Sequence, residues 1–317
     1  QALADNFGYV VEASDLSITA ETANGPYDAV RSVDLTLPRG EALAVVGESG
    51  SGKSLTALAV AGLLSEKLTP TGSVRFDGRE LLGMKPAERR AMAGRRIGFV
   101  FQEPMSSLHP ILTVGQQLEE GLRAHYDMNR RQRADRVREL LDIVGLGRSR
   151  DIAGDRIGQL SGGMRQRVMI AMAISCEPEL VIADEPTTAL DVTLQRQVID
   201  LLASLRERLG LSLLLITHDL GVVAETCDRA VVMYGGQVVE TGPTATLLHD
   251  PAHDYTRALL MSIPVLGDDR LRLPTVASIA PWLRDTRLDP RERRPLTRLV
   301  ELSPGHRARQ DAEGAAA

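Results

Sequence analysis

The chain has 317 residues, of which 43% are hydrophobic and 25% are charged, and its formal net charge is −5 at pH 7. This length is enough for one large domain with subdomains and an appendage. The sequence has no run that approaches the ~18 consecutive apolar residues of a membrane-spanning helix, no visible signal peptide and no basic excess that would indicate nucleic-acid binding. These features favour a soluble enzyme over a membrane channel, and they predict no nucleic-acid partner.

The first part of the chain is typical of β-structure. Val10–Leu37 and Ser73–Phe76 alternate between apolar and polar residues, which predicts the strands of a small antiparallel β layer. The apolar run Ala42–Val46 lies between them and predicts a buried strand.

A glycine-rich segment follows that strand. It reads GESGSGKS, fits the pattern G-x-x-x-x-G-K-[ST] and precedes Leu55–Leu64, whose apolar residues suit a core-facing helix. Its glycines let successive N–H groups converge on phosphate oxygens at the start of a helix, so the context predicts a phosphate-binding loop and not an ordinary Gly/Ser-rich turn. Lys53 is expected to reach the β- and γ-phosphates, and Ser54 to ligate Mg²⁺. The candidate nucleotide-binding residues of this loop are Gly47, Glu48, Ser49, Gly50, Ser51, Gly52, Lys53 and Ser54.

The middle of the chain is predicted to be mainly helical. Ile97–Phe101 reads as a strand that leads into Gln102. Between Glu103 and Gln159 the pattern becomes helical, most clearly in Val114–Leu122 and in the charged, amphipathic run Arg130–Val144.

A second helix start carries small polar residues. Leu160–Met164 reads LSGGM, and the residues that share one face of the following helix are Met164, Val168, Ala171, Met172 and Ser175. Ser161 is predicted to be the N-cap of this buried helix, and with Gly162 and Gly163 it offers an anion site. Because the loop Gly47–Ser54 already encloses the phosphates of its own nucleotide, this second site is expected to serve another nucleotide.

Two acidic residues end the next apolar run. Leu180–Ala183 reads as a central parallel strand that delivers Asp184 and Glu185 at its carboxyl edge. Asp184 can hold Mg²⁺, directly or through water, and Glu185 can direct the water that attacks the γ-phosphate. A solvated turn is the alternative, but it does not explain why the pair follows a phosphate loop.

The remaining core is predicted to alternate between helix and strand. Asp191–Leu209 and Leu220–Thr226 read as helices, and Ser212–Thr217 reads as a buried strand whose end presents His218. An imidazole at that strand end is placed to donate a hydrogen bond to phosphate.

Several features receive an ordinary structural interpretation. Cys176 and Cys227 lack metal-ligand spacing and are expected to be buried, in a reducing environment. The other histidines are expected to be surface or core residues, with a metal site at His249 and His253 as the minor alternative. The segment Pro281–Arg309 is rich in Arg and Pro and has little periodicity, which is typical of a solvated tail, with contact to lipid headgroups as the alternative.

The order and spacing of these motifs resemble those of the ATP-binding cassette (ABC) family over roughly residues 10–260. In that family, LSGG of one subunit closes over ATP held by the phosphate loop of a partner. The resemblance implies an α/β, RecA-like P-loop NTPase fold with a parallel core, an antiparallel β-subdomain and a helical subdomain inserted at about residues 103–162. It also implies a nucleotide-binding domain over residues 1–246, a C-terminal extension over residues 247–317, and a dimer that holds two ATP molecules, with Mg²⁺ as the metal.

The resemblance assigns roles to single residues. Gln102 is similar to the Q-loop glutamine, which contacts Mg²⁺ and water and senses the membrane partner, and Asp191 to the D-loop aspartate, which reaches across the dimer interface. His218 is similar to the switch histidine that contacts the γ-phosphate. Tyr27 is the candidate for stacking on adenine, although many cassettes place this aromatic three residues earlier, where the chain has Asn24; packing within the β layer is the open alternative. The candidate catalytic residues are thus Glu185, His218, Gln102 and Lys53, and the candidate metal ligands are Ser54, Gln102 and Asp184.

Two further stretches bear on the transported substrate. Gln102–Pro110 reads QEPMSSLHP and resembles the Q-loop of oligopeptide, dipeptide and nickel importer ATPases, which commonly read QDPMTSLNP. Pro251–Thr256 resembles the P-x-H-P-Y-T segment near the C-terminus of that subfamily. Many of its members carry a cysteine cluster in the tail, often an iron–sulfur site, whereas no cysteine follows Pro264 here. Import of peptides is therefore the predicted function, without that cluster.

Other classes explain the sequence less well. ABC ATPases that act on chromosomes or DNA-repair substrates insert long coiled coils, and those that act on ribosomes join two cassettes in one chain; neither feature is present. A P-loop kinase or GTPase does not explain LSGGM, Asp191 and His218 together. The expected partners are a second, related but different ABC ATPase subunit, two transmembrane permease subunits and an extracytoplasmic solute-binding protein. The expected location is peripheral, at the cytoplasmic face of the cell membrane.

Overall fold

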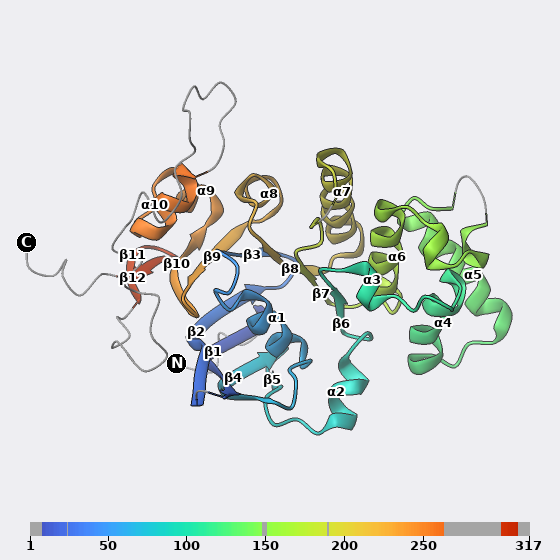
Figure 1. The fold of residues 1–317 in the computed structure, drawn as a ribbon, viewed down its shortest axis with the longest axis horizontal. Coiled ribbons are helices and arrows are strands. Elements are labelled where there is room, and N and C mark those ends of the chain that lie inside the picture. Colours follow the sequence, from blue (N-terminus) through green and yellow to red (C-terminus); the bar gives the residue numbers. More distant parts are fainter. Residues whose placement is uncertain (1–7, 24, 148–150, 189, 263–298, 310–317) are drawn as a thin grey trace, which may run out of the picture. The chain divides into compact units, whose positions relative to one another are not determined.

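The computed structural model describes residues 8–23, 25–147, 151–188, 190–262 and 299–309. The chain divides into two compact units. Unit 1 comprises Gln1–Val10, Leu37–Glu41 and Gly83–Ile216, and unit 2 comprises Val11–Thr36, Ala42–Leu82 and Thr217–Ala317. Figure 1 shows the elements of both units along the chain.

Unit 1 contains the parallel strands β6 (Ile97–Val100), β7 (Leu180–Asp184) and β8 (Ser212–Thr217), with β7 paired to both neighbours. Every residue of β7 and β8 is buried, as expected of apolar strands that are covered on both faces. Helix α6 (Gly162–Ile174) packs closely on this sheet at Gly98, where a Cβ atom would lie 2.2 Å from the carbonyl oxygen of Ala173. The predicted strands at β6, β7 and β8 are confirmed.

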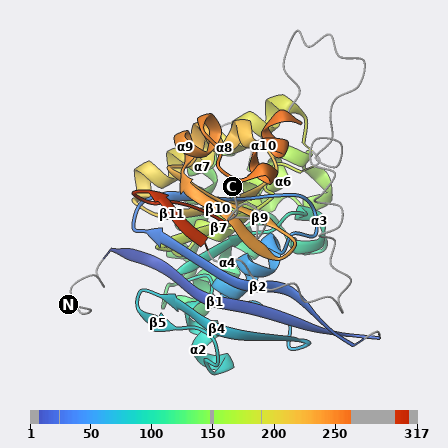
Figure 2. The same ribbon diagram turned by 90° about the vertical axis from the view of Figure 1, so that its left-hand side faces the viewer.

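Unit 2 contains a sheet with the strand order β2-β1-β4-β5. The strand β4 pairs antiparallel with both β1 and β5, and Figure 2 shows these strands running side by side. The bounds are β1 (Tyr9–Thr22), β2 (Gly25–Pro38), β4 (Leu68–Phe76) and β5 (Arg79–Glu80). The predicted β layer is confirmed, but β4 begins five residues before the predicted Ser73, because its pairing with β1 continues to Leu68 beyond an irregularity in register.

A second group of strands in unit 2 surrounds β3 (Ala42–Val46), whose residues are all buried. The strand β3 pairs in parallel with β9 (Arg229–Tyr234), which pairs antiparallel with β10 (Gln237–Pro243). Helix α1 (Lys53–Ala61) follows β3 and stops before the predicted Leu64, because Gly62 takes the left-handed conformation (φ 68°) that commonly ends a helix.

The strand β10 also pairs with a C-terminal hairpin, which corrects the expectation of a solvated tail over Pro281–Arg309. The hairpin consists of β11 (Leu299–Ser303) and β12 (His306–Arg309), and β12 lies against β10. His306 and Ala308 are buried while Arg307 is exposed. This alternation spans too few residues to stand out in an Arg-rich sequence. The rest of the predicted tail, residues 281–298, lies outside the described residues.

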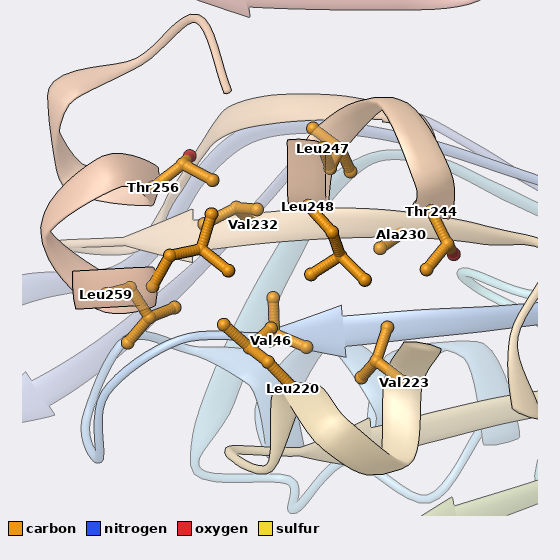
Figure 3. A pocket seen from close by; sticks show the side chains of 11 residues that line it. Val46, Leu220, Val223, Ala230, Val232, Thr244, Leu247, Leu248, Thr256 and Leu259 are labelled. Atoms are coloured by element: carbon orange, nitrogen blue, oxygen red, sulfur yellow. The ribbon is translucent and has the colours of Figure 1, made fainter. Parts of the chain in front are cut away.

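Three helices of unit 2 enclose an apolar pocket against β3 and β9. These are α8 (Leu220–Thr226), α9 (Thr244–His249) and α10 (Asp254–Met261), and Figure 3 shows the side chains that line the pocket. The lining residues are Val46, Leu220, Val223, Ala230, Val232, Thr244, Leu247, Leu248, Thr256, Leu259 and Leu260. Helix α10 is therefore anchored to the same core as β3, the strand that precedes the glycine-rich loop.

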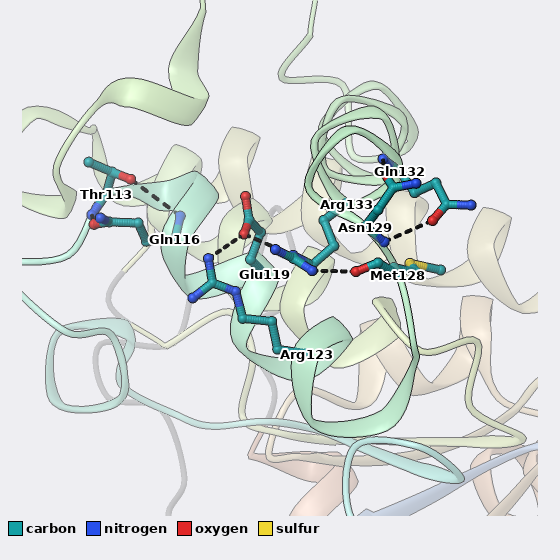
Figure 4. Close-up of polar contacts among 8 residues, drawn as sticks. All are labelled: Thr113, Gln116, Glu119, Arg123, Met128, Asn129, Gln132 and Arg133. Carbon is teal, nitrogen blue, oxygen red and sulfur yellow. Dashed lines mark hydrogen bonds and ion pairs between the residues drawn. The ribbon is translucent and has the colours of Figure 1, made fainter.

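The helical part of unit 1 follows β6. It includes α4 (Val114–His125) and α5 (Arg130–Ile143), which confirm the predicted helices and have Thr113 and Asn129 as their N-caps. Each of these caps accepts a hydrogen bond from the N–H of the glutamine three residues later, and the glutamine side chain bonds back to the cap (Figure 4). The remaining helical elements of unit 1 are α2 (Pro86–Met92), α3 (Pro104–Ser107), α7 (Val192–Leu209) and the 3-10 turns η1 (Ile152–Gly154) and η2 (Ile157–Gln159).

Glu119 joins α4 to α5. Its Oε2 atom accepts hydrogen bonds from Arg123 Nη2 at 2.7 Å and from Arg133 Nε at 3.2 Å, and Figure 4 shows the carboxylate between the two guanidinium groups. Arg133 also donates to the carbonyl oxygen of Met128, in the connection between the helices. Burial alone would raise the pKa of Glu119, but the two arginine hydrogen bonds outweigh it and hold the pKa below the ordinary value of 4.5.

Glu119→Gln should lower the free energy of unfolding by about 1 kcal/mol at pH 7, because two charge-assisted hydrogen bonds lose their anion. A carboxyl group with a lowered folded-state pKa contributes stability that is fully present above its unfolded pKa and is lost as the pH falls through the folded value. The gap between wild type and variant, measured by urea unfolding, should therefore close as the pH falls below 4.5. Glu120→Gln, at the exposed neighbouring position, is the control. An equal loss in both variants, or a gap that persists at low pH, contradicts this account.

Candidate functional site

The loop between β3 and α1 has backbone that favours glycine. Gly47, Gly50 and Gly52 have φ values of 150°, 81° and 95°. A Cβ atom at Gly47 would lie 2.1 Å from the carbonyl oxygen of Met233, and one at Gly52 would lie 2.9 Å from that of Ala29. These contacts explain the spacing of the glycines, which let the loop turn tightly beside the end of β9.

Lys53 closes this loop from the first turn of α1. Its side chain is buried, and Nζ donates hydrogen bonds to the carbonyl oxygens of Gly47 and Glu48, both at 2.8 Å. The ammonium group is thus held inside the loop, while Glu48, Ser49 and Gly50 are exposed. Ser54, half-buried, is the next residue of α1. A positive charge enclosed by a glycine-rich turn at a helix start is suited to bind phosphate.

The acidic pair lies at the carboxyl end of β7, in unit 1. Asp184 is buried as the last residue of the strand. Glu185 has a left-handed backbone (φ 44°), and its N–H donates to the carbonyl oxygen of Ile216 on β8 at 2.9 Å. A non-glycine residue in this region is strained, and such strain is common at functional sites.

The Glu185 carboxylate is held by two side-chain donors. Gln102, which follows β6, donates from Nε2 to Glu185 Oε2 at 3.1 Å, and the Thr188 hydroxyl donates to the same oxygen at 3.0 Å. The ends of the parallel neighbours β6 and β7 thus bring together two of the candidate catalytic residues. Sequence reasoning missed Thr188, although its position three residues after Glu185 is a signal for such a local hydrogen bond.

The other two motifs of unit 1 lie at helix starts. Ser161 caps α6 as predicted, and its hydroxyl accepts the N–H of Met164 at 3.4 Å. Of the two glycines that follow, Gly162 is exposed and Gly163 is buried. Asp191 caps α7 and accepts the N–H of Leu194 at 2.9 Å. The predicted D-loop comprises Ala189, Leu190 and Asp191, and Ala189 lies outside the described residues.

Tyr27 and His218 belong to unit 2, as does the glycine-rich loop. Tyr27 lies on β2 and is 40% exposed, and His218 follows β8 and is exposed. The predicted site residues are therefore divided between the units. The loop Gly47–Ser54, Tyr27 and His218 are in unit 2, and the remainder are in unit 1.

His249 and His253, the alternative metal site, each use a ring nitrogen in a local hydrogen bond, and His249 Nδ1 lies 2.9 Å from the carbonyl oxygen of Ala245. His253 caps α10, and its Nδ1 atom accepts the N–H of Tyr255 at 3.0 Å. Within the described parts of the chain, no three His, Cys, Asp or Glu side chains are grouped so that they could hold a metal ion.

Cys176 and Cys227 are buried, as predicted. None of the helices in the described ranges combines the length and the hydropathy needed to cross a bilayer.

The glycine-rich loop has another contact, which sequence reasoning missed. The Glu48 N–H donates to the hydroxyl oxygen of Tyr255, on α10, at 2.9 Å. In the sequence, the segment that contains Tyr255 stood out only because it resembles the C-terminal segment of peptide importer ATPases.

Comparison with known proteins identifies two matching families and several similar sequences. Residues 30–188 match the family described as ABC transporter, and residues 239–288 match the family described as oligopeptide/dipeptide transporter, C-terminal region. A Brucella abortus protein described as a peptide import ATP-binding protein is 47% identical over 273 residues, which cover 86% of this chain and 82% of that protein. The oligopeptide transport ATP-binding protein AppD of Bacillus subtilis is 44% identical over 274 residues, or 86% of this chain and 84% of AppD.

Among solved structures, the dimeric ATP-binding cassette MJ0796, in a post-hydrolysis state with ADP and Pi, aligns with a TM-score of 0.67 and 31% identity. The alignment covers 74% of this chain and 98% of that one. It confirms the predicted P-loop α/β fold, and the sequence matches confirm the predicted resemblance to peptide importer ATPases. With both the fold and the family matched, the chain belongs to the ABC transporter family, as an ATP-binding subunit that hydrolyses ATP.

Proposed function

We propose that this ABC ATPase drives the import of peptides through separate permease subunits. The observation that carries the substrate class is the match of residues 239–288 to the C-terminal region of oligopeptide and dipeptide transporters, because the ATPase motifs are common to ABC proteins of every kind. Relatives described as peptide importers support the same assignment and disfavour a role in chromosome, repair or ribosome function.

In this proposal the loop Gly47–Ser54 binds the phosphates of ATP. The positive-φ glycines and the enclosed Lys53 ammonium fit a polyphosphate, since a glycine-rich turn at a helix start with a cation beside it is suited to bind phosphate. Tyr27, exposed on β2, is the proposed platform for adenine. His218 is the proposed donor to the γ-phosphate.

The proposed Mg²⁺ ligands are Ser54, Gln102 and Asp184. Their hydroxyl, amide and carboxylate oxygens are the hard donors that Mg²⁺ prefers, so the residue set fits this metal. When bound, Mg²⁺ neutralises charge on the phosphate oxygens. Glu185 is the proposed base. Its carboxylate, oriented by Gln102 and Thr188, accepts a proton from the water that attacks the γ-phosphate.

The proposed assembly pairs this chain with a second ABC ATPase subunit. Ser161, Gly162 and Gly163 at the start of α6 face the nucleotide held by the partner's phosphate loop, and Asp191 reaches toward the same interface. Two transmembrane permease subunits and an extracytoplasmic solute-binding protein complete the importer, with this chain at the cytoplasmic face of the membrane. Closure of the ATPase pair around ATP then opens the permease.

Glu185→Gln tests the catalytic assignment in the reconstituted transporter. ATP binding should persist, while turnover and ATP-driven peptide uptake fall by about 10²–10⁴-fold, because the amide cannot accept the proton. ATPase rate, nucleotide binding and uptake of labelled peptide should be measured on the same preparation. An unchanged rate of ATP hydrolysis would show that Glu185 is not the catalytic base. If the wild-type transporter hydrolyses ATP normally but takes up no peptide, the proposal that peptides are its substrates is wrong.

Lys53→Ala tests the phosphate assignment. Loss of the enclosed cation should weaken ATP binding by about 10- to 100-fold, the usual effect of removing a charged hydrogen-bond donor. Calorimetric titration with ATP gives the Kd. Lys67→Ala makes the same charge change at an exposed position of unit 2 and should leave the Kd unaltered. Near-normal affinity of the Lys53 variant is incompatible with the proposed loop function.

Gly162→Glu tests the paired arrangement. Among the described residues of its own chain, the nearest neighbour of a Cβ at Gly162 is Leu190 Cδ2 at 3.6 Å, an ordinary contact, so the variant should fold. The new carboxylate should repel the nucleotide on the partner and slow hydrolysis there by about 10-fold or more, while this chain still binds ATP.

The matched control for this variant is Gly158→Glu, at an exposed position of η2 where a Cβ meets no atom of the described residues within 4 Å. ATPase rate and peptide uptake should be compared in complexes that carry either variant. Equal activity of the two excludes the proposed role of the α6 start.

A further inference from the structure

Tyr255 connects the C-terminal region of the chain to the phosphate loop. It lies in the first turn of α10, is fully buried, and accepts the N–H of Glu48 on its hydroxyl oxygen at 2.9 Å. Glu48 is the second residue of the loop. Burial raises the pKa of Tyr255 above its ordinary value of 10, so the phenol is neutral under physiological conditions.

The ring of Tyr255 is fixed by its surroundings. It packs against the ring of Tyr234, at the end of β9, with 4.5 Å between centroids and a tilt of 40°. The preceding residue, Met233, is the one whose carbonyl oxygen excludes a side chain at Gly47. The beginning of the phosphate loop therefore has β9 and Tyr255 as neighbours, and α10 lines the same apolar pocket as Val46 (Figure 3).

A buried carboxylate holds the chain segment that leads into α10. Glu240, in the middle of β10, is 0% exposed, and its two carboxylate oxygens accept the N–H groups of Ala252 at 2.8 Å and His253 at 3.1 Å. His253 in turn accepts the N–H of Tyr255. The position of the phenol is thus set by a chain of hydrogen bonds that begins in the sheet.

The C-terminal hairpin joins the same group. His306 Nε2, on β12, forms a buried hydrogen bond of 2.8 Å with Glu240 Oε1. Glu240 thereby links β12, the segment before α10 and, through His253 and Tyr255, the phosphate loop.

We propose that Tyr255 is a positioning residue for the phosphate loop, which orders the loop's first turn before ATP arrives, and that Glu240 and His253 hold Tyr255 in place. The inference rests on the proposed ATP site. A loop that is ordered in advance loses less conformational freedom when ATP binds, so the hydroxyl contributes to binding and little to the chemical step.

Tyr255→Phe is the direct test, since it removes the hydroxyl and keeps the ring against Tyr234. In the assembled transporter, Kd and KM for ATP should rise about 3- to 10-fold, the effect of losing one buried hydrogen bond, while kcat changes by less than about 2-fold. Tyr126→Phe is the matched control. It removes a hydroxyl that donates to the carbonyl oxygen of Cys176 at 3.0 Å in unit 1, and it should leave Kd and KM unchanged.

Urea unfolding of both variants separates a general loss of stability from an effect on the loop. The positioning role is overturned if Tyr255→Phe leaves the Kd at the wild-type value, or if both variants raise it equally. If Lys53→Ala weakens ATP binding and Tyr255→Phe does not, the proposed ATP site stands and only this inference fails.

A double-mutant cycle tests the hydrogen-bond chain. His253→Ala removes the acceptor that holds the Tyr255 N–H, so it should raise the Kd in the same direction. In the double variant with Tyr255→Phe, His253→Ala should raise the Kd by a smaller factor than it does alone, because both changes act through one contact. Fully additive effects on the Kd, in variants that unfold at similar urea concentrations, would show that His253 does not act through Tyr255.

Discussion

The close approach of β9 to the phosphate loop is the constraint from which the geometry of the loop follows. A side chain at Gly47 would overlap the carbonyl oxygen of Met233. Glycine is therefore required at this position, where the chain leaves β3. The parallel pairing of β3 with β9 continues to Val46, the residue before the turn, and it therefore fixes where the loop begins. Lys53 then draws the far end of the loop back by binding the Gly47 and Glu48 carbonyl oxygens.

Unit 1 uses strand ends in a similar way. The backbone at Glu185 adopts a strained conformation, and a hydrogen bond to β8 together with the side chains of Gln102 and Thr188 hold it there. Strain of this kind persists only where several contacts oppose its relaxation. The carboxylate is therefore oriented by hydrogen bonds within the fold, as its proposed role of general base requires.

The sequence predicted those parts of the molecule whose signals are local. Runs of mainly apolar residues identified β3, β7 and β8, and the small polar residues Ser161 and Asp191 identified helix starts. Such signals act within a few residues, because they depend on burial of the strand or on backbone groups of the first helical turn. The roles of the site residues, including Tyr27, remain predictions.

Features that depend on distant partners were not predicted. The contact of Tyr255 with Glu48 joins residues 207 positions apart, and nothing in either local pattern indicates the other. The strands β9 and β10, by contrast, do have a local sequence pattern that predicts their hairpin. They flank Gly235 and Gly236, which have φ values of 55° and 80°, and a pair of glycines between apolar runs is typical of a tight hairpin turn.

The C-terminal hairpin changes which strand is the edge strand of the sheet that contains β9 and β10. Without β12, the backbone N–H and C=O groups of β10 near Glu240 and Thr241 would form an open edge, a template for pairing with another molecule. With the hairpin in place, the edge strand among those described is β11, which is five residues long and mostly exposed and which carries the charged Glu301. Short, charged edges of this kind resist edge-to-edge aggregation. The last strands that the structure describes thus limit edge-to-edge pairing as well as completing their sheet.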